Sequence, residues 1–166
     1  MKKYFKNGEI KNYNEIVIKK EGIVNCTPTE EQILADGWID YNATLDGAKE
    51  KLINEVKNYD KSESVECVYI KGEKTWYNKQ ERVAIMNLAN CYKNTEMNSC
   101  VLFVNGSPYT YTCDTLIDML TQLEIYASEC FNATQTNINS IKTLLTLDEV
   151  KSFDYISKYP TPLEFL

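Results

Sequence analysis

The apolar and polar positions change period several times along the chain, and each change predicts a new element. Residues 4–25 alternate loosely between apolar and polar side chains around two turn signals, Asn7-Gly8 and Glu21-Gly22. A period of two is typical of strands, and Asn-Gly is a favoured hairpin turn. We therefore predict a small β-meander over this stretch.

The next segment, TPTEEQILADGW, carries the start and stop signals of a short helix. Thr27 as N-cap and Glu30 three residues later match a capping box, with Pro28 at the first helical position. Gly37 suits the left-handed residue that ends many helices. These signals predict a helix over residues 28–36.

Helical and strand-like stretches then alternate. Apolar residues from Leu45 to Val56 recur at helical spacing and predict a helix that begins near Asp46. Residues 64–78 form two β-prone runs around Lys71-Gly72, and residues 99–112 form two more around Asn105-Gly106. Each pair of runs predicts a hairpin.

Asn78 and Glu81 match a capping box before the segment KQERVAIMNLANCYKN, which predicts a helix between the two hairpins. The helical period assigns its inner face to Val83, Met86 or Leu88, and Cys91.

The longest predicted helix covers about residues 114–145. A 4-3 spacing over about four heptads is typical of a seam against another helix. At 1.5 Å per residue the helix would be about 48 Å long, so part of it should project or be covered by a partner. The seam positions are Leu116, Leu120, Leu123, Ala127, Cys130, Thr134, Asn137, Ile141 and Leu144.

Thr134 and Asn137 are polar residues on this seam, and two interpretations remain open. Polar seam residues weaken packing but can determine register or oligomeric state, which would make Thr134, Asn137 and Ile141 candidate partner contacts. Alternatively, the seam leaves the core at this point, and the polar residues are exposed to solvent.

The end of the chain carries a further capping box, Thr146 to Glu149, which predicts a helix to about Lys158. The proline-containing segment YPTPLEFL should be extended. Its apolar residues Leu163, Phe165 and Leu166 either pack on the chain's own core or insert into a neighbouring molecule.

The predicted order has hairpins covered by helices and no alternating β-α-β units, which predicts an α+β fold. We expect two parts. Residues 1–44 would form an N-terminal element of hairpins and a short helix, and residues 45–166 would form an α+β domain with a long helix.

Composition limits the function. The 166 residues carry a net charge of −6, which argues against nucleic-acid binding, although residues 1–20 have six Lys against two Glu. These lysines could meet an acidic partner or simply be solvated.

The chain has no His, which excludes the commonest general base and metal ligand. The six Cys form no C-x-x-C pair, and with no apolar signal at residues 1–10 we expect free thiols in a reducing cytoplasm.

Few residues suggest chemistry. Asp114 and Asp118 are one helical turn apart and could hold a cation, although Asp114 also suits a helix start.

The aromatic residues Trp76, Tyr77, Tyr109 and Tyr111 either line a pocket or pack across the sheet and on the long helix. Trp76 and Tyr77 are further candidate partner contacts. A glycosidase would need paired carboxylates, and no pair suggests itself. We expect no catalytic residue, cofactor or metal.

From Asp46 onward, the order of elements with VYIKGEKTWYN, VLFVNGSPYTYTCDTLIDML and CFNATQTNINSIKTLLTLDEV resembles an uncharacterised domain of phage and prophage tail-module proteins (domain of unknown function 4376). The shared ending is Ile141, Thr146, Glu149 and Val150. The segment NCTPTEEQILADGW is similar to a recurring sequence motif in the short N-terminal segments of small phage tail proteins. In this chain Cys26 interrupts the motif, between Asn25 and Thr27.

This resemblance implies a non-enzymatic virion structural or adaptor protein of a bacteriophage tail or tail fibre. It would be made in the host cytoplasm, be present in several copies, and contact other virion or tail-fibre proteins without inserting into a membrane. The same resemblance fits a tail-fibre assembly chaperone that is not retained in the virion.

Overall fold

The computed structural model describes residues 2–166, which contain five α-helices and ten short strands. The predicted α+β class is confirmed: the strands form small, mainly antiparallel sheets, and the helices include one of 31 residues. Contacts between Cα atoms divide the chain into two units. Unit 1 comprises the residues up to Glu55 together with Ile138–Asp154, and unit 2 comprises Val56–Asn137 together with Tyr155–Leu166. The expected boundary after residue 44 stays a prediction.

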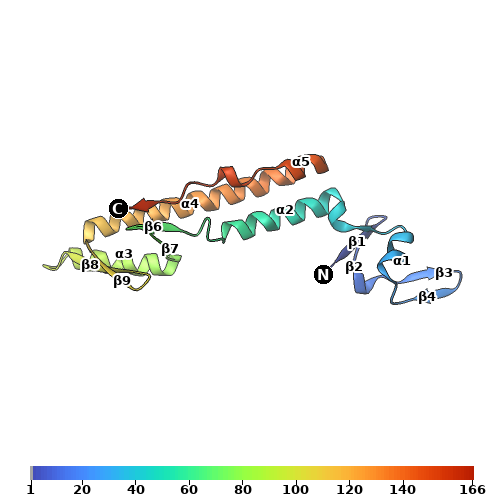
Figure 1. Ribbon diagram of the computed structural model, residues 1–166, viewed down its shortest axis with the longest axis horizontal. Helices are drawn as coiled ribbons and strands as arrows, with labels where there is room; N and C mark the ends of the chain where they lie inside the picture. Colours follow the sequence, from blue (N-terminus) through green and yellow to red (C-terminus); the bar gives the residue numbers. More distant parts are fainter. Residues whose placement is uncertain (1) are drawn as a thin grey trace. The chain divides into compact units, whose positions relative to one another are not determined.

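Unit 1 contains two hairpins in separate sheets, so the predicted meander is wrong (Figure 1). Strand β1 pairs with β2 on one side and with β5 on the other, whereas β3 pairs only with β4. The core of these strands and α1 is formed by Tyr4, Ile16, Ile33 and Trp38. The strands and short helices are β1 (Lys3–Lys6), β2 (Glu9–Asn12), η1 (Tyr13–Glu15), β3 (Ile18–Lys20), β4 (Ile23–Asn25), α1 (Glu30–Ala35), β5 (Ile39–Asp40) and η2 (Tyr41–Ala43).

Helix α1 begins two residues later than predicted. Thr29 is the N-cap and shares a capping box with Gln32, while Thr27 lies outside the helix. Both threonines satisfy the local capping pattern. The backbone amide of Thr27 is instead bound by the side chain of Asn25, at 3.0 Å. Gly37 has φ +87°, which confirms the left-handed stop.

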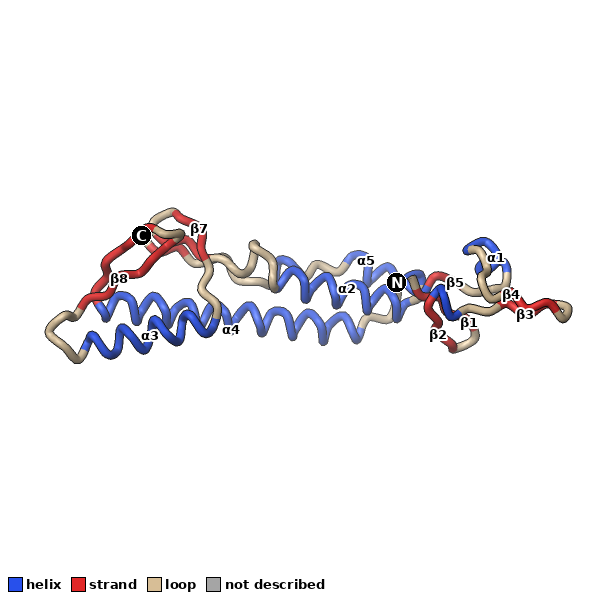
Figure 2. The backbone as a smooth tube through the Cα atoms, turned by 90° about the horizontal axis from the view of Figure 1, so that it is seen from below, coloured by secondary structure: helices blue, strands red, loops and turns tan. Residues whose placement is uncertain are grey.

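Helix α2 (Leu45–Asp60) begins in unit 1, and its last turn belongs to unit 2. Unit 2 then has two hairpins and helix α3 (Figure 2). Their bounds are β6 (Val68–Ile70), β7 (Glu73–Thr75), α3 (Lys79–Lys93), β8 (Ser99–Val104) and β9 (Ser107–Thr112). The capping box of Asn78 and Glu81 is confirmed. The predicted inner face of α3 is confirmed only at Met86, which packs partly buried against the core of unit 2. Val83, Leu88 and Cys91 are exposed, and the buried residues of the helix are Arg82 and Ala89.

All four hairpins turn in the same way. Both residues of each two-residue turn have positive φ, as at Asn105 (48°) and Gly106 (88°). This conformation matches the right-handed twist of the strands, and it favours Asn and Gly because other side chains are strained there. The turns at Asn7-Gly8, Glu21-Gly22, Lys71-Gly72 and Asn105-Gly106 are therefore confirmed.

Helix α4 (Cys113–Thr143) confirms the predicted long helix, and its seam is covered by the same chain. Seven of the nine seam positions are buried, and Ala127 and Leu144 are half-buried. The core of unit 2 joins α4 to β6, β8 and α3. Most seam positions are therefore buried by residues of the same chain, so their burial does not require a partner.

The C-terminal segment contains the short helix α5 (Leu147–Ser152), η3 (Ile156–Lys158) and the strand β10 (Glu164–Phe165). The capping box of Thr146 and Glu149 is confirmed, but α5 ends six residues before Lys158. Strand β10 lies parallel to β6 and extends the sheet of unit 2 to the order β10-β6-β7. The amides of Tyr69 and Lys71 donate to the carbonyls of Leu163 and Phe165, each at 2.8 Å.

Candidate interaction surfaces

The polar seam residues of α4 hold the C-terminal segment of unit 2. The Thr134 hydroxyl donates to a carboxylate oxygen of Asp60 at 2.6 Å. Its oxygen is 2.7 Å from the Tyr159 hydroxyl, which therefore donates to it. Asn137 donates its amide to the carbonyl of Tyr155 at 3.0 Å. Thr134 and Asn137 are buried, so the solvent-exposed interpretation is wrong, and the groups that they bind here belong to the same chain.

The other predicted contact residues lie in different environments. Ile141 is fully buried, so it is not available as a contact. Leu163 and Phe165 are partly buried and pack against the core of unit 2, which confirms that the chain end packs on its own core. Leu166 follows them and is 89% exposed. Of these four side chains, only that of Leu166 is exposed enough to contact a neighbouring molecule.

Trp76 and Tyr77 join the first hairpin of unit 2 to the rest of that unit. The Trp76 ring meets the Tyr126 ring of α4 edge-on, with the ring centres 6.2 Å apart. The Tyr77 hydroxyl donates to the carbonyl of Phe103 in β8 at 2.7 Å. The Tyr109 hydroxyl donates to Glu73 at 2.7 Å. These contacts show that Trp76, Tyr77 and Tyr109 pack across the hairpins and on the long helix, and Trp76 also lines a pocket.

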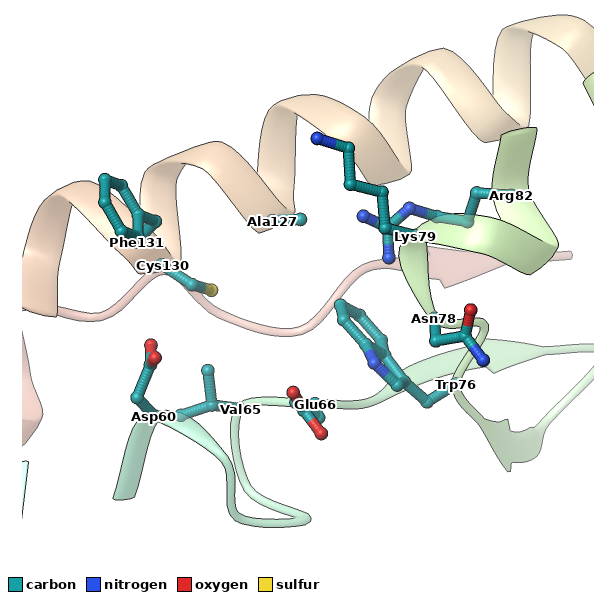
Figure 3. A pocket seen from close by; sticks show the side chains of 10 residues that line it. All are labelled: Asp60, Val65, Glu66, Trp76, Asn78, Lys79, Arg82, Ala127, Cys130 and Phe131. Atoms are coloured by element: carbon teal, nitrogen blue, oxygen red, sulfur yellow. The ribbon is translucent and has the colours of Figure 1, made fainter. Parts of the chain in front are cut away.

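Arg82 lies at one end of a pocket of about 290 Å³ (Figure 3). Its guanidinium donates to Glu124 at 2.8 and 3.4 Å and to the carbonyl of Tyr77 at 2.6 Å. It also lies 5.4 Å from the centre of the Trp76 ring, within the range of a cation–π contact. The guanidinium lowers the pKa of Glu124 by hydrogen bonding to it.

The pocket is lined by both polar and apolar side chains. Its remaining lining residues are Asp60, Val65, Glu66, Asn78, Lys79, Ala127, Cys130 and Phe131. The volume is at the lower limit of small-molecule sites, which is about 300 Å³. Among residues 2–166, no group of three or more His, Cys, Asp or Glu residues could hold a metal ion. Asp114, one of the two acids suggested for a cation, pairs with Lys93 at 2.6 Å.

The outer face of the β8–β9 hairpin is the apolar surface that sequence reasoning missed. Side chains of β8 alternate between buried and exposed, with Cys100, Leu102 and Val104 inside. Val101 is 50% exposed and Phe103 is 62% exposed, and they lie on the opposite face. The signal is present in the sequence, because the five successive apolar residues from Cys100 to Val104 must place apolar side chains on both faces of the strand.

This surface also lacks charge. Residues 98–113 include no Asp, Glu, Lys or Arg, in a chain that is 25% charged. Opposite Val101 and Phe103, the exposed residues of β9 are Thr110 and Pro108. We call Val101, Phe103, Pro108 and Thr110 the hairpin face. Covering apolar side chains removes them from water, which is favourable, and the hairpin itself contributes no charged side chain that would have to be desolvated.

Unit 1 also has exposed apolar side chains, and several of its lysines form ion pairs. Ile23 and Val24, in the β3–β4 hairpin, are 72% and 55% exposed. Lys2 binds Glu30, Lys3 binds Glu50 at 3.1 Å, and Lys6 binds Asp36 at 2.7 Å. With Lys11, which pairs with Glu9 at 3.1 Å, four of the six lysines in residues 1–20 form ion pairs with carboxylates of the same unit.

Comparisons with known proteins give no relative: no family model, no curated protein and no solved structure matches this chain. None of the helices within residues 2–166 is sufficiently long and apolar to span a bilayer.

Proposed function

We propose that this protein is a non-enzymatic structural or adaptor protein of a bacterial virus, located in the tail or its fibres. The observation that carries a contact function is the hairpin face, where Val101 and Phe103 point outward on an uncharged hairpin. A cluster of exposed apolar side chains favours a protein interface over a solvated surface. The viral setting is supported by the resemblance of residues 46–150 to phage tail-module proteins.

The hairpin is suited to such a contact because its inner face is anchored. Cys100, Leu102 and Val104 belong to the buried core of unit 2. The Asn105 side chain donates to the carbonyl of Lys74 at 3.1 Å, and Tyr77 donates to the carbonyl of Phe103 at 2.7 Å. A preorganised surface loses little conformational entropy when it binds, which favours affinity.

The same surface also suits a fibre-assembly chaperone, which would bind its client transiently. The two roles differ in whether the protein remains in the mature particle. In either role it would contact other virion or tail-fibre proteins and be present in several copies.

The deciding measurement is quantitative mass spectrometry of density-purified particles of the source virus, with the portal protein as the internal reference. Recovery at a fixed copy ratio would support the structural role, and that ratio would report the symmetry. Absence from particles together with abundance in the infected-cell lysate would support the chaperone. Absence from both would overturn the viral assignment.

A matched pair of variants tests the surface itself. Phe103→Ser should lower incorporation into particles, or client capture, by about tenfold, because a large apolar contact in an interface contributes roughly 1–2 kcal/mol. Val83→Ser alters an exposed side chain on α3 and should leave incorporation unchanged. Equal incorporation of the two variants and the wild type would remove the hairpin face from the interface.

A further inference from the structure

Two of the six cysteines lie in direct contact in the core of unit 2. Cys100 is in β8 and Cys113 is the first residue of α4, and their sulfur atoms are 3.5 Å apart. Both side chains are buried. The other cysteines have different surroundings: Cys26 and Cys91 are exposed, and the Cys67 thiol is directed at the carbonyl of Ser64, 3.7 Å away.

The hairpin register brings these two thiols together. Ser99 is opposite Thr112 in the β8–β9 ladder, and one residue further the amide of Cys113 donates to the carbonyl of Asn98 at 3.2 Å. Backbone hydrogen bonds therefore hold the chain beside each cysteine. A disulfide has its sulfurs about 2.05 Å apart, so the sulfurs must approach each other by roughly 1.5 Å.

We propose that Cys100 and Cys113 are a redox modification site, and that they form a reversible intramolecular disulfide when the protein meets a peroxide. The thiolate of one cysteine attacks hydrogen peroxide, forms a sulfenic acid and releases hydroxide, which takes up a proton to become water. The thiol of the other cysteine then attacks that sulfur, the S–S bond forms, and a second water leaves. Two thiols lose two hydrogens, and one peroxide is reduced to two waters.

Burial controls the rate of this reaction. Desolvation, with a further contribution from the neighbouring thiol, raises the pKa of Cys100 to about 11. A thiol that is rarely ionised reacts slowly, so oxidation should require transient opening of the hairpin. The disulfide would then close a loop that contains β8 and β9 and would join the start of β8 to the start of α4. Closing this loop restricts the unfolded chain and stabilises the fold.

The experiment uses the full chain with Cys26→Ala and Cys91→Ala, which removes the exposed thiols and with them disulfides between molecules. The reduced protein is treated with hydrogen peroxide, alkylated and digested with chymotrypsin, which can cleave at Phe103 and Tyr109 between the two cysteines. We expect a peptide pair linked through Cys100 and Cys113 that dithiothreitol separates. The oxidised protein should melt on the order of 10 °C above the reduced protein.

Matched variants separate this pair from the other buried thiols. In the same background, Cys100→Ser should abolish the linked peptide and the rise in Tm, and Cys67→Ser should retain both. Should Cys100→Ser fail to fold, Cys113→Ser provides the same comparison. A folded protein that yields no Cys100–Cys113 link after peroxide treatment, or whose Tm does not rise when the link forms, would overturn the proposal. This result is independent of the viral role.

Discussion

Three polar side chains lie among the buried residues of the chain from 2 to 166: Arg82, Thr134 and Asn137. Each joins segments distant in sequence. Arg82 reaches Glu124 on α4, and Thr134 and Asn137 reach the segment that follows α5. A buried polar group is costly without partners, so these side chains favour one arrangement of segments over others that are equally apolar.

The ion pair of Arg82 and Glu124 gives a first prediction. Glu124→Ala should lower the free energy of unfolding by about 2–3 kcal/mol, because it leaves a buried guanidinium with one partner fewer. Arg82→Met keeps most of the side-chain volume and should cost about 1 kcal/mol. Urea denaturation of both variants measures the difference. A larger loss for Arg82→Met would show that packing, and not the charge, dominates at this position.

The same pair predicts a pH dependence. The pKa of Glu124 is lowered in the folded state by its hydrogen bond to Arg82. Its contribution to stability is therefore complete above the ordinary carboxyl pKa of 4.5 and is lost as the pH falls through the lowered value. Glu124→Gln should lose less stability between pH 5 and about pH 2 than the wild type does. Parallel curves for the two proteins would contradict this assignment.

Asn137 gives a prediction about the core. Its side chain is fully buried, its amide donates to Tyr155, and its carbonyl oxygen has no hydrogen-bond partner. Asn137→Asp removes the donor and buries a carboxylate, so it should cost more than about 2 kcal/mol at pH 7. Burial raises the pKa of such a carboxyl, so the loss should shrink as the pH falls and the acid is protonated. Asn139→Asp, at an exposed position, is the control.

The elements of unit 2 are joined by pairings between distant segments. The last strand, β10, pairs with β6, about 95 residues earlier in the chain. The sheet would otherwise be a two-stranded hairpin, which is marginal on its own in water. The C-terminal residues thus complete a structural element that begins in the middle of the chain.

Substitutions in β10 test this role. Phe165→Ala should lower the free energy of unfolding by about 2 kcal/mol, because Phe165 is partly buried against the core of unit 2. Leu166→Ala, at a position that is 89% exposed, should change it by less than about 0.5 kcal/mol. Thermal or urea denaturation compares the two variants. Equal stability would show that the C-terminal strand does not contribute to the stability of the sheet.

At the scale of the whole molecule, the net charge is divided equally between the two units. Unit 1 contains 10 Lys and 13 Asp or Glu residues, and unit 2 contains 8 Lys or Arg and 11 Asp or Glu, so each carries a net charge of −3. The lysines near the start of the chain pair with carboxylates of unit 1. The molecule therefore presents no strongly basic surface from this strip, and polyanions should bind it weakly.

Retention on a heparin column measures how strongly the protein binds a polyanion. The wild type should elute without retention at about 0.1 M salt, where the Debye length is about 10 Å. A variant with Glu30→Gln, Asp36→Asn and Glu50→Gln exposes three lysines and should be retained. The control removes three carboxylates for which no ion pair is found, through Glu66→Gln, Glu96→Gln and Glu129→Gln. Equal retention would mean that net charge alone governs binding.

The sequence by itself determined the features that depend on a few adjacent residues. Asn105-Gly106 predicts its turn because the two residues must adopt positive φ, and Asn78 with Glu81 predicts the start of α3 because both partners lie within one turn. The length of α4 was also predictable, because its apolar period is continuous over about eight turns. Such signals are local, and the tertiary structure did not alter them.

Only the tertiary structure decided which residues are buried and which segments meet. The period of α3 could not show that Arg82 is buried and Val83 exposed, since that depends on Glu124, 42 residues away. Thr134 and Asn137 lie inside because a distant segment supplies hydrogen-bond partners. The contact of Cys100 with Cys113 likewise depends on the hairpin register together with the position of the first turn of α4. Burial depends on the position of every neighbour in space, and a local pattern specifies only one side of each contact.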